Sequence, residues 1–152
     1  MAEYRAEELV WTDERLWPQF LNRAIDDPDQ VAVVDCGGRE WTRAEMRELA
    51  EQFAVQLTDA GAGRGHRILV SATKTAATLA VALATSSLEA TFCPYSPKLG
   101  KADLALLEDR LGHSARVEVA GDSAIEILLP ANDQMSADPR NRDVALIGFT
   151  SG

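Results

Sequence analysis

The sequence predicts an α/β fold in which flanking helices cover a layered, largely parallel β-sheet. Two observations support this prediction. Short apolar or β-branched runs alternate with helical stretches along most of the chain, and the connections between them are short. Alternating strands and helices of this kind pair in parallel through right-handed crossovers. The 152 residues are enough for one domain with a buried core.

The first part of the chain is predicted to contain an arm, a helix and a hairpin. Residues 1–11 form a loose arm, and the folded unit covers residues 12–152. Apolar residues then recur every three or four positions from Leu16 to Ile25, which is typical of a helix. We expect Thr12 and Asp13 to cap this helix and Pro28 to end it. The runs 31–35 and 40–42 form a hairpin around Gly37-Gly38.

The strongest local signal is the sequence Thr42-Arg43-Ala44-Glu45. It is a capping box, in which the threonine hydroxyl and the glutamate carboxylate each satisfy a backbone N–H. An apolar stripe at helical spacing follows as far as Leu57, and Gly61 is expected to end the helix in a left-handed conformation.

The remaining elements alternate. We expect a strand buried on both faces, then a helix that is apolar nearly all round, and then shorter elements. The expected strands are 68–70, 91–93 (ended by Pro94), 115–119, 125–129 and 144–149; the helices are 75–88 and 102–111; and 132–142 is a surface loop.

Composition excludes several functions. The chain has 24 acidic and 15 basic residues, a net charge of −9, whereas nucleic-acid binders are usually basic on one face. This charge also argues against anionic membranes. Neither a membrane span nor a signal peptide is present, so we expect a cytoplasmic protein. Cys36 and Cys93 are expected to be free, buried thiols. His66 and His113 have no ligand-type neighbours at metal-binding spacing, so we expect no metal site.

Few residues suggest chemistry. The run Gly61-Ala62-Gly63-Arg64-Gly65 joins a helix to a strand and lacks dinucleotide-binding spacing, so it is interpreted as a turn. Lys74 follows a strand and could approach a ligand, although a solvated lysine is the favoured interpretation. Ser71, Thr73 and Thr75 are expected to cap the following helix.

The end of the sequence carries a different signal. An apolar strand runs into Thr150-Ser151-Gly152, which is how a glycine-rich phosphate-binding loop begins. The same three residues also open ordinary turns.

The order of these motifs resembles the N-terminal part of the adenylate-forming superfamily, which contains acyl- and aryl-CoA synthetases, adenylation domains of non-ribosomal peptide synthetases, and luciferases. The likeness runs from about residue 12 to the end. Its motifs are the opening helix LWPQFLNRAIDDPDQVAVV, the helix start at 41–46, the turn GAGRGHRILV, the segment 92–97, and Thr150-Ser151-Gly152. The chain departs from the family pattern at His66 (usually Asp), Glu89 (usually Gly) and Gly100 (often Pro). For Glu89 we expect a local change of the backbone or a degenerate copy.

The resemblance implies that the parent protein is an ATP-dependent ligase. A carboxylic acid attacks the α-phosphate of Mg-ATP, and the acyl group then passes to the thiol of CoA or of a carrier protein. Thr150, Ser151 and Gly152 are the implied start of the phosphate-binding loop, and the other family residues lie downstream of the 152 residues. We therefore expect no catalytic or metal-binding residue in this chain, and we expect it to bind ATP poorly and to be inactive alone. We also expect it to self-associate through an exposed apolar face.

Two alternatives stay open. The chain could be a non-catalytic scaffold, or it could be an unrelated nucleotide-binding α/β module that binds ATP or NAD without an acid.

Overall fold

The computed structural model describes residues 15–112, 115–130 and 146–148. Its elements are α1 (Leu16–Asp26), β1 (Val31–Val34), β2 (Glu40–Thr42), α2 (Arg43–Asp59), β3 (Arg67–Ser71), α3 (Ala76–Ser87), β4 (Thr91–Tyr95), α4 (Lys101–Leu111), β5 (Ala115–Ala120) and β6 (Ala124–Leu128). The four-stranded sheet has the order β4-β3-β5-β6, with β6 antiparallel to β5 and the other pairs parallel. The predicted layered, largely parallel α/β fold is confirmed.

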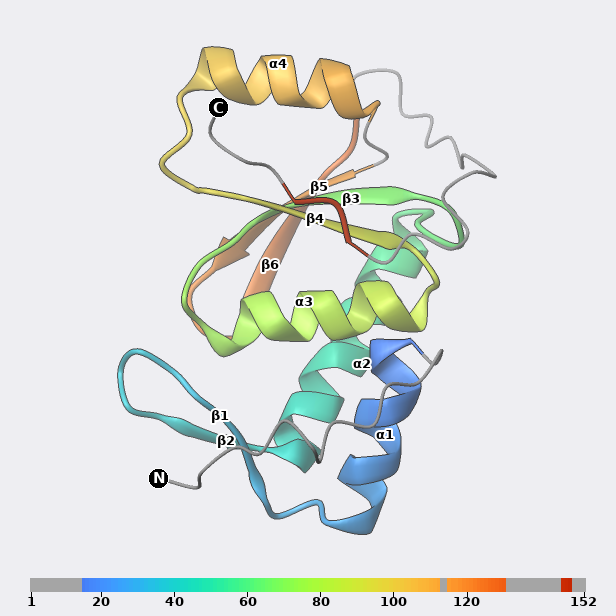
Figure 1. Ribbon diagram of the computed structural model, residues 1–152, viewed down its shortest axis with the longest axis vertical. Helices are drawn as coiled ribbons and strands as arrows, with labels where there is room; N and C mark the ends of the chain where they lie inside the picture. Colours follow the sequence, from blue (N-terminus) through green and yellow to red (C-terminus); the bar gives the residue numbers. More distant parts are fainter. Residues whose placement is uncertain (1–14, 113–114, 131–145, 149–152) are drawn as a thin grey trace, which may run out of the picture.

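The central strand β3 supplies both faces of the sheet with apolar side chains. Ile68 and Val70 belong to the main core, whereas Leu69 belongs to a second core under α4, and all three are 0% exposed. Successive side chains of a strand point to opposite faces, so a strand covered on both sides must be apolar throughout. Figure 1 shows α3 below the sheet and α4 above it.

The N-terminal elements extend the main core. The capping box is present: Thr42 Oγ1 accepts from Glu45 N at 3.2 Å, and Glu45 Oε2 accepts from Thr42 N at 2.7 Å. Helix α2 then buries the predicted stripe against α3. The buried residues of this stripe are Met46, Leu49, Ala50, Phe53 and Leu57.

The start of α1 differs from the prediction. The helix begins at Leu16 with Arg15 at the N-cap, and the Arg15 side chain makes no capping hydrogen bond. Thr12 and Asp13 lie outside the described residues. Instead, a helix N–H finds a distant partner, because Trp17 N donates to Ser86 Oγ at 3.0 Å. This hydrogen bond ties the start of α1 to the C-terminal end of α3.

Strand β4 is longer than predicted, because it continues through Pro94 to Tyr95. Phe92 O accepts from Ile147 N at 3.0 Å on one side of β4, whereas Tyr95 O accepts from Ala72 N at 2.8 Å on the other, β3 side. Since backbone groups alternate along a strand, the nitrogen of Pro94 points away from β3, like the groups of Phe92. A proline is tolerated there because β3 needs no donor from it.

Other predicted details are also corrected. Cys93 is buried, but Cys36 is exposed; both are free thiols. Ser71 does not cap α3, because its Oγ accepts from Val119 N at 2.9 Å and so joins β3 to β5. Thr75 occupies the N-cap of α3 without a side-chain capping bond. His113 and the predicted loop 132–142 lie outside the described residues.

Two helices end in the same motif with different residues. After α2, Ala62 N donates to Leu57 O and Gly61 N donates to Thr58 O, both at 2.8 Å. After α3, Ala90 N donates to Thr85 O at 3.0 Å and Glu89 N donates to Ser86 O at 3.1 Å. Both are Schellman motifs, which place one residue in the left-handed region.

That left-handed residue is Gly61 (φ 92°) in one motif and Glu89 (φ 55°) in the other. The backbone at Glu89, the position at which the chain departs from the family pattern, therefore has the left-handed conformation that glycine favours. Because glutamate has a Cβ, it adopts this conformation at a cost in free energy.

This comparison yields a prediction for Glu89→Gly. The left-handed region costs a residue with a Cβ roughly 1–2 kcal/mol, and the exposed ion pair with Arg64 (2.8 Å) contributes little. We expect the substitution to raise the free energy of unfolding by about 0.5–1 kcal/mol in urea denaturation. The matched control, Gly61→Ala, should lower it by a similar amount. A destabilised Glu89→Gly chain would show that the ion pair outweighs the strain.

His66 generates a second prediction. Its Nδ1 accepts from Gly63 N at 2.7 Å, and burial lowers the pKa of the imidazole below 6.5. The folded state thus binds fewer protons than the unfolded state in this range. The stabilisation is complete above about pH 6.5 and decreases as the pH falls through the folded-state pKa.

We expect the free energy of unfolding to fall by about 0.5–1 kcal/mol between pH 7.5 and pH 5, as one hydrogen bond is lost. His66→Asn, which keeps an acceptor but does not titrate, should reduce this fall in parallel denaturation curves. An unchanged pH profile in the variant would assign the effect to other groups.

Candidate functional site

The carboxyl ends of the parallel strands form one edge of the sheet, and ligands of open α/β sheets bind outside this edge. Strand β3 ends there at Ser71 and strand β4 at Tyr95. Leu146 forms a parallel bridge with Phe92, so the segment 146–148 runs beside β4 in the same direction. The predicted phosphate-binding residues Thr150, Ser151 and Gly152 follow this segment and lie outside the described residues.

A polar network lies on the α4 side of the sheet near this edge. Tyr95 Oη donates to Glu118 Oε1 at 2.7 Å, and Arg116 binds both Glu118 (3.3 Å) and Glu108 of α4 (2.7 Å). Burial raises the pKa of the Tyr95 phenol above its ordinary value, and the Glu118 carboxylate raises it further. Tyr95 is therefore a neutral hydrogen-bond donor, and the network joins β4, β5 and α4.

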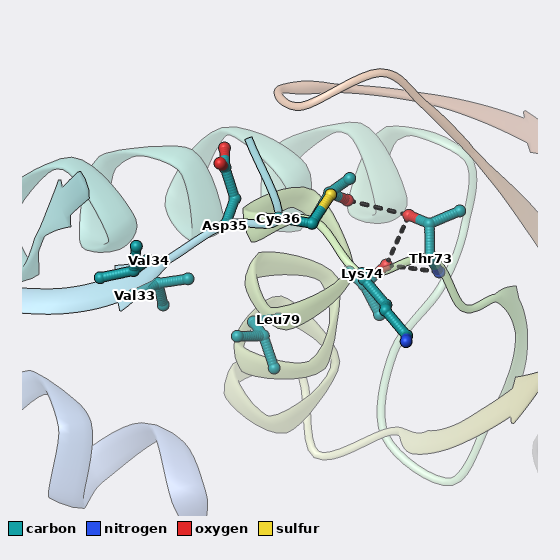
Figure 2. Close-up of a pocket in the computed structure, with 9 residues that line it drawn as sticks. Val33, Val34, Asp35, Cys36, Thr73, Lys74 and Leu79 are labelled. Atoms are coloured by element: carbon teal, nitrogen blue, oxygen red, sulfur yellow. Dashed lines mark hydrogen bonds between the residues drawn. The ribbon is translucent and has the colours of Figure 1, made fainter. Parts of the chain in front are cut away.

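A pocket of about 380 Å³ opens between the β1–β2 hairpin and the start of α3 (Figure 2). The pocket has an apolar part and a polar rim. Its lining residues are Val33, Val34, Asp35, Cys36, Thr73, Lys74, Thr75, Thr78 and Leu79.

Hydroxyl groups hold the α3 side of this pocket. Thr73 Oγ1 lies 2.9 Å from Thr75 Oγ1 and 3.1 Å from Thr78 Oγ1, and Thr73 N donates to Thr78 Oγ1 at 3.0 Å. Thr73 and Thr75, which were predicted to cap α3, instead form a network of hydroxyl groups with Thr78 at the start of this helix. Lys74 is exposed at the rim, which agrees with the solvated lysine expected from the sequence.

The opposite wall contains residues that the sequence analysis missed. Asp35 Oδ1 accepts from Gly37 N (2.9 Å) and Arg39 N (3.0 Å), and Oδ2 accepts from Trp41 Nε1 (3.3 Å). Although desolvation opposes them, these bonds hold the pKa of Asp35 below its usual value. Asp35 therefore organises the hairpin turn. An aspartate two residues before a Gly-Gly turn is the sequence signal that could have revealed this role.

The described residues contain no group of three or more His, Cys, Asp or Glu side chains that could hold a metal ion. Within the same ranges, none of the helices combines the length and apolar character needed to cross a membrane. The residues that line this pocket lie far from Thr150, Ser151 and Gly152 in the sequence, and these three lie outside the described residues.

Comparison with known proteins gives the family. The family model of AMP-binding enzymes matches residues 20–131, which is more than half of the chain. The hybrid PKS-NRPS synthetase thnA of Trichoderma harzianum is 30% identical over 156 residues; the match covers 90% of this chain and 4% of that protein.

Solved structures share the fold at lower identity. IdnL1 gives a TM-score of 0.68 at 22% identity, over 88% of this chain and 31% of that chain. The N-terminal domain of FACL13 from Mycobacterium tuberculosis gives 0.65 at 20% identity, over 69% and 27%. The N-terminal subdomain of Klebsiella oxytoca NpsA gives 0.65 at 16% identity, over 71% and 28%.

The chain spans less than a third of the length of these relatives. With the family model covering α2 to β6, the chain belongs to the AMP-binding, adenylate-forming enzyme family.

Proposed function

We propose that this chain is the N-terminal segment of an ATP-dependent ligase that activates a carboxylic acid. The family match over residues 20–131 carries this proposal. In the proposed reaction, the carboxylate attacks the α-phosphate of Mg-ATP, pyrophosphate leaves, and the acyl group passes from the adenylate to a thiol. The thiol belongs to CoA or to a carrier protein; the hybrid PKS-NRPS synthetase among the relatives favours a carrier protein.

The role that we propose for the described residues is to build the sheet edge at which the nucleotide binds. The segment 146–148 runs parallel to β4 and precedes Thr150-Ser151-Gly152 in the sequence. We propose that the backbone N–H groups and hydroxyls of these three residues begin the loop that binds the ATP phosphates. Small residues suit this role because they let the backbone approach an anion.

We propose that the 152 residues alone do not catalyse the reaction. Phosphate binding draws on several converging groups and on neutralisation of charge, and a chain of net charge −9 opposes the approach of ATP. Within the described ranges, the acidic side chains with close partners serve the hairpin turn, helix caps and ion pairs.

Pyrophosphate exchange tests this function. With a panel of carboxylic acids, we expect no acid-dependent incorporation of labelled pyrophosphate into ATP by the chain, and measurable exchange by a longer form that continues beyond Gly152. In that longer form, Gly152→Val should reduce exchange at least about tenfold, because a branched side chain blocks the approach of the backbone to phosphate. Acid-dependent exchange by the 152 residues would contradict inactivity; nucleotide binding by the longer form without any acid dependence would instead contradict the ligase assignment.

Self-association of the chain is a further prediction. Several large apolar side chains are more than 40% exposed: Leu16, Ile25, Val31, Val34, Val55, Leu79, Leu106, Leu129 and Leu146. We propose that some of these side chains are covered when copies of the chain associate. Light scattering should give a mass that rises with concentration above 16.5 kDa. Ile25→Ser with Val55→Ser should reduce the rise, and a constant monomer mass at high concentration would contradict it.

A further inference from the structure

The pocket between the hairpin and α3 has the size and the apolar walls of a small-molecule site. Its volume of about 380 Å³ lies within the range of roughly 300–1,000 Å³ that is usual for ligand pockets. Figure 2 shows Val33 and Val34 on the hairpin side and Leu79 on α3. Val34 is 61% exposed and Leu79 is 49% exposed. An apolar group that enters the pocket is therefore stabilised by contact with both walls.

The threonine hydroxyls in the lining have one proton more than the hydrogen bonds between them use. Thr73 Oγ1 lies 2.9 Å from Thr75 Oγ1 and 3.1 Å from Thr78 Oγ1. Each hydroxyl carries one proton, so these two bonds use two of the three protons, whichever group donates. None of the described residues accepts the third proton, although Thr78 is only 8% exposed. The network therefore presents a hydrogen-bond donor to the pocket.

Lys74 adds a positive charge to the polar part of the pocket. It is exposed, and it takes no part in the ion pairs among the described residues. Asp35 lines the same pocket, but its oxygens accept from the N–H groups of Gly37, Arg39 and the Trp41 indole. Figure 2 shows the Asp35 carboxylate and the Lys74 ammonium pointing away from each other. The charge of Lys74 is therefore available to a ligand.

We propose that this pocket binds an aliphatic carboxylate, with its carboxylate group between Lys74 and the threonine hydroxyls and its chain between Val34 and Leu79. An ionised carboxylate only accepts hydrogen bonds, so it matches an ammonium group and a spare hydroxyl proton. Inorganic phosphate uses the polar part alone and leaves the apolar walls uncovered. The site is separate from the reaction proposed above, and its test involves neither ATP nor pyrophosphate.

Protection of Cys36 from iodoacetamide by octanoate tests the proposal. Cys36 lines the pocket and is an exposed thiol, so a bound ligand shields it. The alkylation rate then falls by a factor of one plus the ratio of the octanoate concentration to its Kd. Cys93 is an internal control, because it is buried and burial raises the pKa of its thiol to about 11. The protein concentration is one at which light scattering gives the monomer mass.

We expect octanoate to slow the alkylation of Cys36 at least about threefold, whereas octylamine and inorganic phosphate leave the rate unchanged. Lys74→Gln and Leu79→Ser should each raise the Kd for octanoate at least about threefold, because one removes a charge-assisted hydrogen bond and the other an apolar contact. Each variant is compared with and without octanoate, which cancels any direct effect on the thiol.

The matched controls lie on α4. Lys101→Gln makes the same change of charge as Lys74→Gln, and Leu106, like Leu79, is 49% exposed. Lys101→Gln and Leu106→Ser should leave the protection by octanoate unchanged. Unreacted Cys93 in mass spectra verifies that every variant is folded.

Three results would overturn the proposal. An alkylation rate that octanoate does not change in the original chain would show that the pocket does not bind the probe. Full protection in Lys74→Gln would show apolar adsorption without recognition of the carboxylate. Equal protection by inorganic phosphate would identify a general anion site instead.

Discussion

The burial of β3 on both faces is the constraint on which the rest of the structure depends. Ile68 and Val70 need a cover of side chains on one face of the sheet, and Leu69 needs one on the other. Helix α3 connects β3 to β4, and helix α4 connects β4 to β5. Because β4 and β5 lie on opposite sides of β3, the two right-handed crossovers run in opposite directions across the sheet. They therefore place α3 on one face of the sheet and α4 on the other. Helices α1 and α2 add a further layer, which buries most residues of α3 but leaves Leu79 exposed.

Most of the fold could be predicted from the sequence because local and long-range signals agree. The capping box at Thr42 and Glu45, the stripe to Leu57 and the apolar run at 68–70 each specify one element and one buried face. Errors arose where a tertiary contact replaced a local one. Ser71 bonds to β5 instead of capping α3, and Pro94 is allowed inside β4 only because its nitrogen points away from β3.

The candidate site was less predictable for the same reason. The sequence pointed to Thr150-Ser151-Gly152, since small residues directly after a strand are typical of the start of a phosphate-binding loop. The pocket beside α3 is assembled from two segments about forty residues apart, and only the folded chain brings Cys36 near Thr73 and Lys74. The exposure of Cys36 depends on the shape of the hairpin turn, which Asp35 holds through three hydrogen bonds. The spacing of the cysteines in the sequence therefore does not predict that Cys36 is exposed.

The proline in β4 has a consequence for synthesis of the protein on the ribosome. The outer side of β4 receives its hydrogen bond from Ile147, which is translated about fifty residues after Tyr95. At roughly 5–20 residues per second, the nascent chain carries an uncovered sheet edge for several seconds. Such an edge can pair with the edge of a neighbouring nascent chain. Pro94 removes one of the few N–H donors on that side, so a foreign strand finds an incomplete ladder while the proper partner is still being made.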